Sequence, residues 1–330
     1  MPDVLTHVLF GYDMIDYLDK SKYRDFINKN KKLFILGCQG PDIFFYNDFW
    51  PWIKGKRGPS LGKLMHREKT GEYFIKSLEY IKQKSGEGCF GELFSYITGA
   101  MCHFGLDRVV HPYIFYYSGK YNKNDVKTHK YREYHKKLEL IIDALLLKEK
   151  KDLLSHKYPV YKEIDLGKEL PKSIRKFYKH IIKSVYNLDI KGDFSNDAYK
   201  DMKRVLKVMY DPLGFKKILL NSIDFIKRGR IKYSNLTYPR KFINDKDYLN
   251  ESNKIWLHPC DETKSYNASF HQLYNRAKDE SENMIDNGIK FLNNKLTKKE
   301  LKEAFPNLSY STGEEINNNI VMKYFDPIFD

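Results

Sequence analysis

The stretch from Phe90 to Val110 reads FGELFSYITGAMCHFGLDRVV and is followed directly by His111. It is apolar for most of its length, yet His103, Asp107 and His111 recur in it at intervals of four residues. In an α-helix this spacing brings the three side chains to one face. A polar group buried in an apolar helix is costly unless it finds a partner. The stretch therefore predicts a buried helix with a polar cluster along one side.

A metal ion would satisfy the three side chains together, because imidazole nitrogen and carboxylate oxygen are ligands that zinc accepts. Pro112 disfavours the helical conformation at the residue before it, so we expect the helix to end near His111 and to turn this imidazole away from His103. In that arrangement Asp107 would be shared between two metal ions. The alternative is a pair of core histidines capped by an aspartate, and for the triplet the metal interpretation is favoured.

A second cluster repeats the same spacing in His135, Glu139 and Asp143. It merges with the apolar residues of a predicted helix over 131–150, which favours His135 and Glu139 as metal ligands. Asp143 then becomes a partner that orients an imidazole. A competing pair with equal spacing, His129 and Glu133, lies just upstream, where a solvated pair at the start of a helix is the simpler interpretation.

Three further candidates are weak when each is taken alone. Asp42 follows Gly40 and Pro41, a combination that also marks ordinary turns and helix starts. His66 stands without a partner of regular spacing. His7 falls in an apolar segment and is equally well read as a core histidine.

Helical periodicity dominates the rest of the chain and predicts the all-α class. No alternating strand pattern is visible. Residues 37–62, 117–128 and 229–266 are rich in glycine, proline or polar residues and predict loops. We expect one domain over 1–330, with a metal-site core over 1–150 and a helical C-terminal part over 151–330. Helices are predicted over 4–19, 21–36, 68–84, 90–110, 131–150, 172–187, 195–209, 212–228 and 267–294.

The overall composition favours anionic partners. The 330 residues carry a formal net charge of +15, which suits phospholipid headgroups, nucleic acid or phosphorylated small molecules. A generally lysine-rich composition is an equally good explanation. The four cysteines form no CxxC pair and predict no disulfide framework. The chain shows neither a signal peptide nor a membrane-spanning stretch, so we expect a cytoplasmic protein.

Taken in order, these residues resemble a known family. His7, Gly-Pro-Asp42, His66, the His103/Asp107/His111-Pro motif and the His135/Glu139/Asp143 motif look like the bacterial zinc-dependent phospholipases C. The same pattern occurs in the catalytic domain of glycosylphosphatidylinositol-specific phospholipase D, and P1-type nuclease is a more distant relative. The resemblance covers about residues 1–150, and the ordered set is specific although no single member is.

The resemblance implies a helical fold and three zinc sites. Asp42, His66, His103 and Asp107 would hold the first ion. His111, His135 and Glu139 would hold the second, and His7 and Asp107 would help to hold the third. The chain begins Met-Pro and lacks the N-terminal tryptophan that completes the third site in the family, so two or three zinc ions are expected.

The resemblance also implies hydrolysis of a phosphoric ester, most simply a phosphodiester, by zinc-activated water. Asp42 is the candidate to orient or deprotonate that water. Phe45, Trp50 and Trp52 lie in or beside a loop rich in glycine and proline and are candidates for substrate binding. A phospholipid, with peripheral contact to a membrane, is the first choice of substrate. The alternatives are a P1-like nuclease and a binding module that uses metal only for stability.

Overall fold

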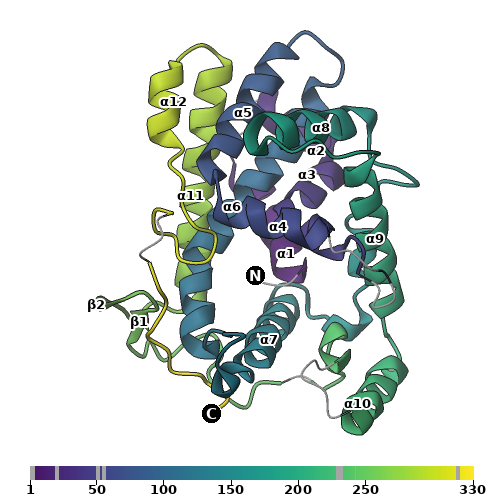
Figure 1. Cartoon of the computed structure of the whole chain (residues 1–330), viewed down its shortest axis with the longest axis vertical. Helices are drawn as coiled ribbons and strands as arrows, with labels where there is room; N and C mark the ends of the chain where they lie inside the picture. Colours follow the sequence, from purple (N-terminus) through teal and green to yellow (C-terminus); the bar gives the residue numbers. More distant parts are fainter. Residues whose placement is uncertain are drawn as a thin grey trace.

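The computed structural model describes residues 4–18, 22–49, 53, 57–227, 233–241, 243–316 and 320–330. The predicted all-α class is confirmed (Figure 1). The α-helices are α1 (Val4–Tyr17), α2 (Lys22–Lys29), α3 (Lys31–Gly37), α4 (Arg57–Arg67), α5 (Thr70–Gln83), α6 (Phe90–Ser118), α7 (Tyr131–Lys151), α8 (Lys172–Tyr186), α9 (Phe194–Met209), α10 (Phe215–Lys227), α11 (Phe270–Leu292) and α12 (Lys298–Ala304). The 3-10 helices are η1 (Gly40–Tyr46), η2 (Val126–Thr128), η3 (Ser155–Lys157), η4 (Val160–Lys162) and η5 (Tyr233–Leu236).

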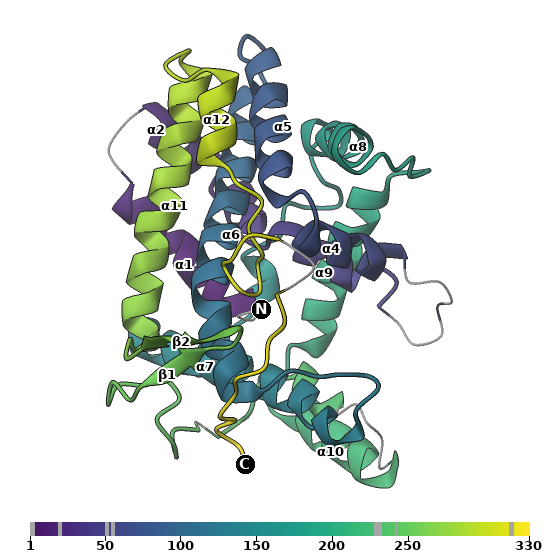
Figure 2. The ribbon, with the colours of Figure 1, turned by 60° about the vertical axis from the view of Figure 1, so that its left-hand side comes forward.

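Helix α6 forms the centre of the molecule. It packs against α1, α2, α3, α5, α7, α8 and α11, and Figures 1 and 2 show it running between them. Most of its 29 residues are buried, on every side of the helix. A helix that is apolar all round belongs in a protein core or in a membrane. Among the described residues, no helix combines the length and apolar character that crossing a bilayer requires.

The prediction that this helix ends near His111 is wrong. Helix α6 continues to Ser118 with Pro112 inside it. A proline at this position cannot donate to the carbonyl of Arg108, four residues earlier. That carbonyl lies against Gly313, where an added Cβ would come within 2.6 Å of the Arg108 oxygen. The helix thus continues past Pro112, and the Arg108 carbonyl that has no helical donor packs against Gly313.

Other boundaries also differ from the predicted ones. The expected helix over 21–36 is two helices, separated at Asn30, whose side chain donates to the carbonyl of Phe26. The predicted loop over 37–62 contains η1 and the start of α4. Pro59 is tolerated there because it lies in the first turn of α4, where a backbone N–H has no partner within the helix. Helix α12 is short and was not predicted.

A small antiparallel hairpin was also missed. Strands β1 (Trp256–His258) and β2 (Asp261–Tyr266) pair with each other, with an irregularity between Leu257 and His258. The strands have only three and six residues, and most of β2 is exposed. Alternation between apolar and polar residues has no room to appear in elements of this length.

Two glycines allow α3 and α6 to touch along their backbones. A Cβ at Gly99 would lie 2.2 Å from the carbonyl oxygen of Phe34, and one at Gly37 would lie 2.2 Å from that of Tyr96. Both contacts are shorter than any real Cβ contact, and both involve backbone that cannot move aside easily. The close approach matters for the site, since α3 leads directly into η1 and α6 carries the polar cluster.

We expect Gly99→Ala to lower the free energy of unfolding by about 1 to 3 kcal/mol, because the added methyl forces the two helices apart. Urea unfolding at a fixed zinc concentration measures it. The matched control is Gly86→Ala, where nothing lies within 4 Å of the added Cβ; its effect should stay within about 1 kcal/mol. Equal effects of the two changes would contradict the close packing of α3 on α6.

Candidate metal centre

Helix α6 places three polar side chains in the core. His103 and Asp107 are fully buried and His111 is 2% exposed. Asp107 Oδ2 lies 3.3 Å from His103 Nε2 and 3.8 Å from His111 Nδ1. The four-residue spacing therefore does bring the three side chains to one face, with the carboxylate between the two imidazoles.

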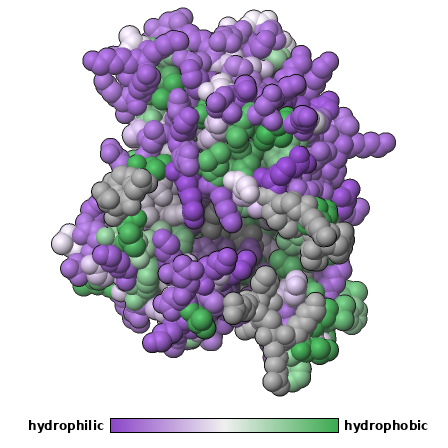
Figure 3. Space-filling view, viewed as in Figure 1, coloured by the Kyte–Doolittle hydropathy of each residue, from purple (hydrophilic) through white to green (hydrophobic). Residues whose placement is uncertain are grey.

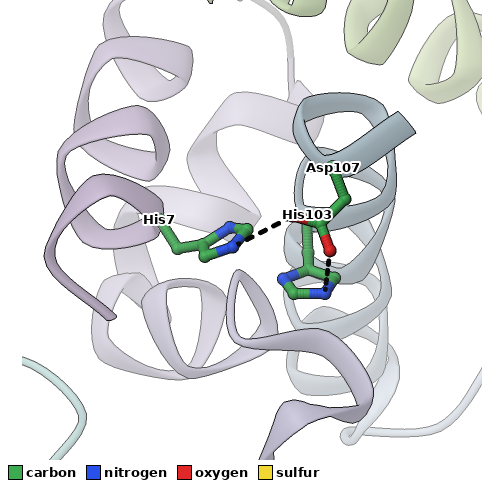
Figure 4. Close-up of side chains that lie close together, drawn as sticks. All are labelled: His7, His103 and Asp107. Carbon is green, nitrogen blue, oxygen red and sulfur yellow. Dashed lines mark ion pairs between the residues drawn. The ribbon is translucent and has the colours of Figure 1, made fainter. Parts of the chain in front are cut away.

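Helix α1 adds His7, which approaches the other oxygen of Asp107. His7 Nε2 lies 3.3 Å from Asp107 Oδ1, and the ring of His7 stacks on that of His103 with centroids 4.2 Å apart. Figure 4 shows both imidazoles directed at the one carboxylate. His7 is 1% exposed, so this part of the cluster lies deep in the molecule.

Asp42 and His66 meet at the edge of the cluster. Asp42 lies on η1 and His66 near the end of α4, and Asp42 Oδ1 is 3.1 Å from His66 Nε2. Gly40, two residues before Asp42, allows η1 to pack against His103. It has a φ of +50°, and a Cβ there would come within 2.3 Å of the His103 ring. Only glycine combines that backbone conformation with that contact.

Helix α7 supplies the remaining pair. His135 Nε2 lies 3.0 Å from Glu139 Oε1, and the two group with His111. Burial by itself would raise the pKa of Glu139, but positive charge around the carboxylate, including that of His135 and Lys136, lowers the pKa to about 2. Glu139 is thus an anion throughout the physiological range.

The competing pair lies elsewhere. His129 is partly exposed, its Nε2 lies 3.2 Å from the carbonyl oxygen of Lys123, and its ring lies beside that of Tyr121. The structure therefore groups His135 and Glu139, rather than His129 and Glu133, with the polar residues of α6.

Backbone carbonyls orient three of the imidazoles. Nδ1 of His103 lies 3.1 Å from the carbonyl oxygen of Cys38, Nδ1 of His111 lies 2.7 Å from that of Tyr310, and Nδ1 of His66 lies 2.6 Å from that of Gly62. A carbonyl only accepts, so each Nδ1 is the donor. In a neutral ring Nε2 then carries the lone pair. Burial holds the pKa of His103 and of His111 well below the ordinary value, which keeps both rings neutral.

His135 is oriented differently, since its Nδ1 lies 3.1 Å from the hydroxyl of Ser118. Sequence patterns cannot reveal the carbonyl partners, because every residue carries a carbonyl. Tyr310 is the most distant of them in sequence, 199 residues beyond His111. The region after residue 150 therefore contributes to the geometry of the centre, although the grouped side chains all come from residues 7–139.

Several buried atoms of the cluster have no hydrogen-bond partner among the described residues. They are both ring nitrogens of His7, Nε2 of His103, Nε2 of His111, Oδ1 of Asp42 and both carboxylate oxygens of Asp107. Leaving so many buried polar atoms unsatisfied is expensive. Without a cation nearby, burial raises the pKa of Asp107. A bound cation reverses these penalties.

The distances fit shared coordination. There are three groups in which one ligand atom from each residue lies within 4.8 Å of the others in that group. The groups are His7, His103 and Asp107; Asp42, His66 and His103; and His111, His135 and Glu139. Two ligands at tetrahedral positions, each about 2.0 Å from zinc, are about 3.3 Å apart. His7 and His103 each lie 3.3 Å from a different oxygen of Asp107. The donor set of imidazoles and carboxylates suits zinc.

Asp143 has partners other than the predicted imidazole. Its carboxylate accepts hydrogen bonds from the backbone N–H of Leu5 and Thr6, from the Thr6 hydroxyl, and from the hydroxyl of Tyr238. An anion at the N-terminus of a helix binds orphan N–H groups and is favoured by the helix dipole. Asp143 thus anchors α1, the helix that carries His7.

Three of the ligand candidates are partly accessible to solvent. The side chains of Asp42 and His66 are each 10% exposed and that of His135 is 21% exposed, whereas His7, His103 and Asp107 are sealed. Figure 3 shows a hollow in the surface at the place where Figure 1 shows the start of α1. The ligand candidates thus differ in their access to solvent, which reaches Asp42, His66 and His135 but not His7, His103 or Asp107.

Aromatic rings lie beside the more accessible ligand candidates, His66 and His135. Phe45 is partly buried with its ring centroid 5.2 Å from that of His66, and Phe115 lies 4.7 Å from His135. Tyr310 lies 4.6 Å from His66. Of the predicted substrate-binding residues, Phe45 is thus next to the centre, while Trp50 and Trp52 lie outside the described residues.

The comparisons with known proteins agree with this geometry. The family model described as zinc dependent phospholipase C matches residues 6–207, more than half of the chain. No curated protein and no solved structure matched the chain. The match spans every side chain of the three ligand groups. The chain belongs to the zinc-dependent phospholipase C family, whose members are hydrolases.

Proposed function

We propose that the protein is a zinc-dependent phosphodiesterase that cleaves phospholipids in the manner of a phospholipase C. The observation that carries the proposal is Asp107. Both of its oxygens are buried without a hydrogen-bond partner among the described residues, and each lies 3.3 Å from the Nε2 atom of a different histidine. A purely structural carboxylate would be hydrogen-bonded.

The three ligand groups support two complete sites and a weaker third. His111, His135 and Glu139 would hold one ion. His103 belongs to both of the other groups, yet its Nε2 has one lone pair and binds a single ion. If His103 joins Asp42 and His66, the third group is left with His7 and Asp107. Asp107, whose two oxygens lie beside His7 and His103, would be shared between ions.

Zinc held by these residues supplies a water of lowered pKa and positive charge against the phosphate oxygens. Asp42 is the proposed catalytic residue, because its carboxylate lies at the accessible edge of the cluster. It would orient the attacking water and accept its proton. The new bond forms between water oxygen and phosphorus as the phosphorus–alcohol oxygen bond breaks, and the alcohol leaves with a proton. From a phospholipid the products are diacylglycerol and a phosphorylated headgroup.

The surroundings favour an amphipathic anionic substrate. Phe45 and Phe115, beside His66 and His135, can contact apolar groups of a substrate, and the net charge of +15 attracts phosphate. Family membership favours a phospholipid over a nucleic acid. Nucleic acid is the alternative substrate that the hydrolysis experiment includes.

Zinc content separates the pair His135/Glu139, which lies within α7, from the pair His129/Glu133, whose histidine precedes the helix. We expect His135→Ala to lose about one zinc ion per chain, because it removes one of three ligands of a site. Inductively coupled plasma mass spectrometry of purified protein measures this. His129→Ala is the matched control and should keep the wild-type content. Loss of zinc in the control alone would overturn the assignment.

Hydrolysis tests the function itself. We expect Asp107→Asn to lower kcat/KM for phosphatidylcholine at least about 100-fold, because an amide cannot provide the bridging negative charge. Phosphorus NMR follows the release of phosphocholine. Asp152→Asn, an exposed change at the end of the same helix that carries Glu139, is the control and should match wild type.

Two outcomes would contradict the proposal. Cleavage of single-stranded DNA but of no phospholipid by the zinc-loaded protein would favour a nuclease. Stable zinc binding without cleavage of either substrate would favour a binding module that uses the metal for stability.

A further inference from the structure

Helix α10 displays an apolar face to solvent. The large apolar residues of this face lie three, four or seven residues apart and therefore share one side of the helix. Their exposed fractions are high: Phe215 68%, Ile218 54%, Leu219 62%, Phe225 83% and Ile226 77%. Contiguous exposed apolar surface of this kind marks an interaction site.

The opposite side of α10 holds the helix to the protein through polar contacts. Lys217 Nζ donates to the carbonyl oxygens of Ser234 and Thr237, at 2.5 and 3.0 Å. The carboxylate of Asp224 accepts from the backbone N–H groups of Tyr233 and Ser234. Ordinary surface helices bury their apolar face and expose their polar one. Here the arrangement is inverted, and the apolar face is left for something outside the chain.

A short series of contacts joins α10 to the metal centre. Lys217 binds the segment around η5, and Tyr238, directly after this segment, donates to Asp143. Asp143 in turn binds the first turn of α1, the helix of His7. Figures 1 and 3 show α10 below the hollow, with exposed apolar atoms at this end of the molecule. The helix is therefore linked through these contacts to α1, and it lies at the end of the molecule below the hollow.

The chain around α10 is strongly basic. Residues 200–232 contain ten lysines and arginines against three aspartates and no glutamate. Lys207, near the end of α9, is exposed, and so is Lys216 of α10, whose Nζ donates to the carbonyl oxygens of Val208 and Tyr210. Cationic residues next to an apolar helix face are the signature of helices that lie in the interface of an anionic bilayer.

Resting on the proposed function, we propose that α10 is an interfacial helix that docks the protein on the surface of an anionic phospholipid bilayer. Its apolar face enters the boundary between headgroups and acyl chains, and its basic neighbours contact the phosphates. With 13 residues the helix is too short to cross a bilayer and lies in the membrane plane. Docking there brings the centre to the lipid surface. A second copy of this segment is the poorer occupant, since two such basic regions would repel each other.

Vesicle flotation tests the proposal with the zinc-loaded full-length protein, after a short incubation in the cold. The vesicles contain phosphatidylcholine with or without phosphatidylglycerol. We expect binding that increases with phosphatidylglycerol, and at least a tenfold fall in the partition coefficient for Phe225→Ser/Ile226→Ser, which is less than full burial of the two side chains in the membrane would provide.

The matched control is Ile255→Ser, which replaces a residue of similar exposure, 72%, just before β1. In Figures 1 and 2, β1 and α10 lie at opposite sides of the molecule, so the control should bind vesicles as wild type does. Thermal unfolding midpoints of all three proteins show that the variants fold.

Failure to bind vesicles with phosphatidylglycerol would overturn the proposal, as would equal binding by the double variant. A wild-type dimer in light scattering that becomes monomeric in the double variant would assign the face to a second copy instead. Hydrolysis of a short-chain phospholipid below its micelle concentration is measured separately. Vesicle binding that depends on Phe225 and Ile226 in a protein without this hydrolysis supports the interfacial helix, and only the proposed function then fails.

Discussion

The carboxylate of Asp107 is the constraint around which the rest of the structure is arranged. It is fully buried in a helix that is apolar on all sides, and burial keeps the pKa of the neighbouring His103 and His111 low and both rings neutral. An anion in that position is costly unless a cation shares the space. Ligand candidates from α1, η1, α4 and α7 converge on the same space, so metal binding and folding of this core are expected to stabilise each other. Removing the metal would leave several buried polar atoms unsatisfied at once.

A second layer of contacts determines where those ligands point. Carbonyl oxygens of Cys38, Gly62 and Tyr310 leave one ring nitrogen of each imidazole for the metal, and Asp143 fixes the start of α1. Tyr310 lies beyond residue 207, where the match to the family model ends. Residues far along the chain thus set the geometry of a centre whose ligands lie in its first half.

Much of this could be predicted from the sequence, for a physical reason. Polar side chains at four-residue intervals in an apolar segment have to meet on one buried face, which identifies His103, Asp107 and His111 directly. The choice of His135 over His129 follows from burial, since both have a glutamate at the same spacing. Pro112 misled the prediction because local conformational preference was overridden by packing against Gly313. The inverted face of α10 could not be recognised, because periodicity identifies an apolar face without saying whether it points inward. Carbonyl partners leave no pattern in the sequence.

The measurement that tests the central claim most directly is anomalous X-ray scattering at the zinc edge from crystals of the protein. The account predicts two or three peaks among the side chains of the three ligand groups, with Asp107 in contact with at least one. An empty cluster in zinc-saturated crystals, or zinc bound by His129 and Glu133 instead, would contradict it.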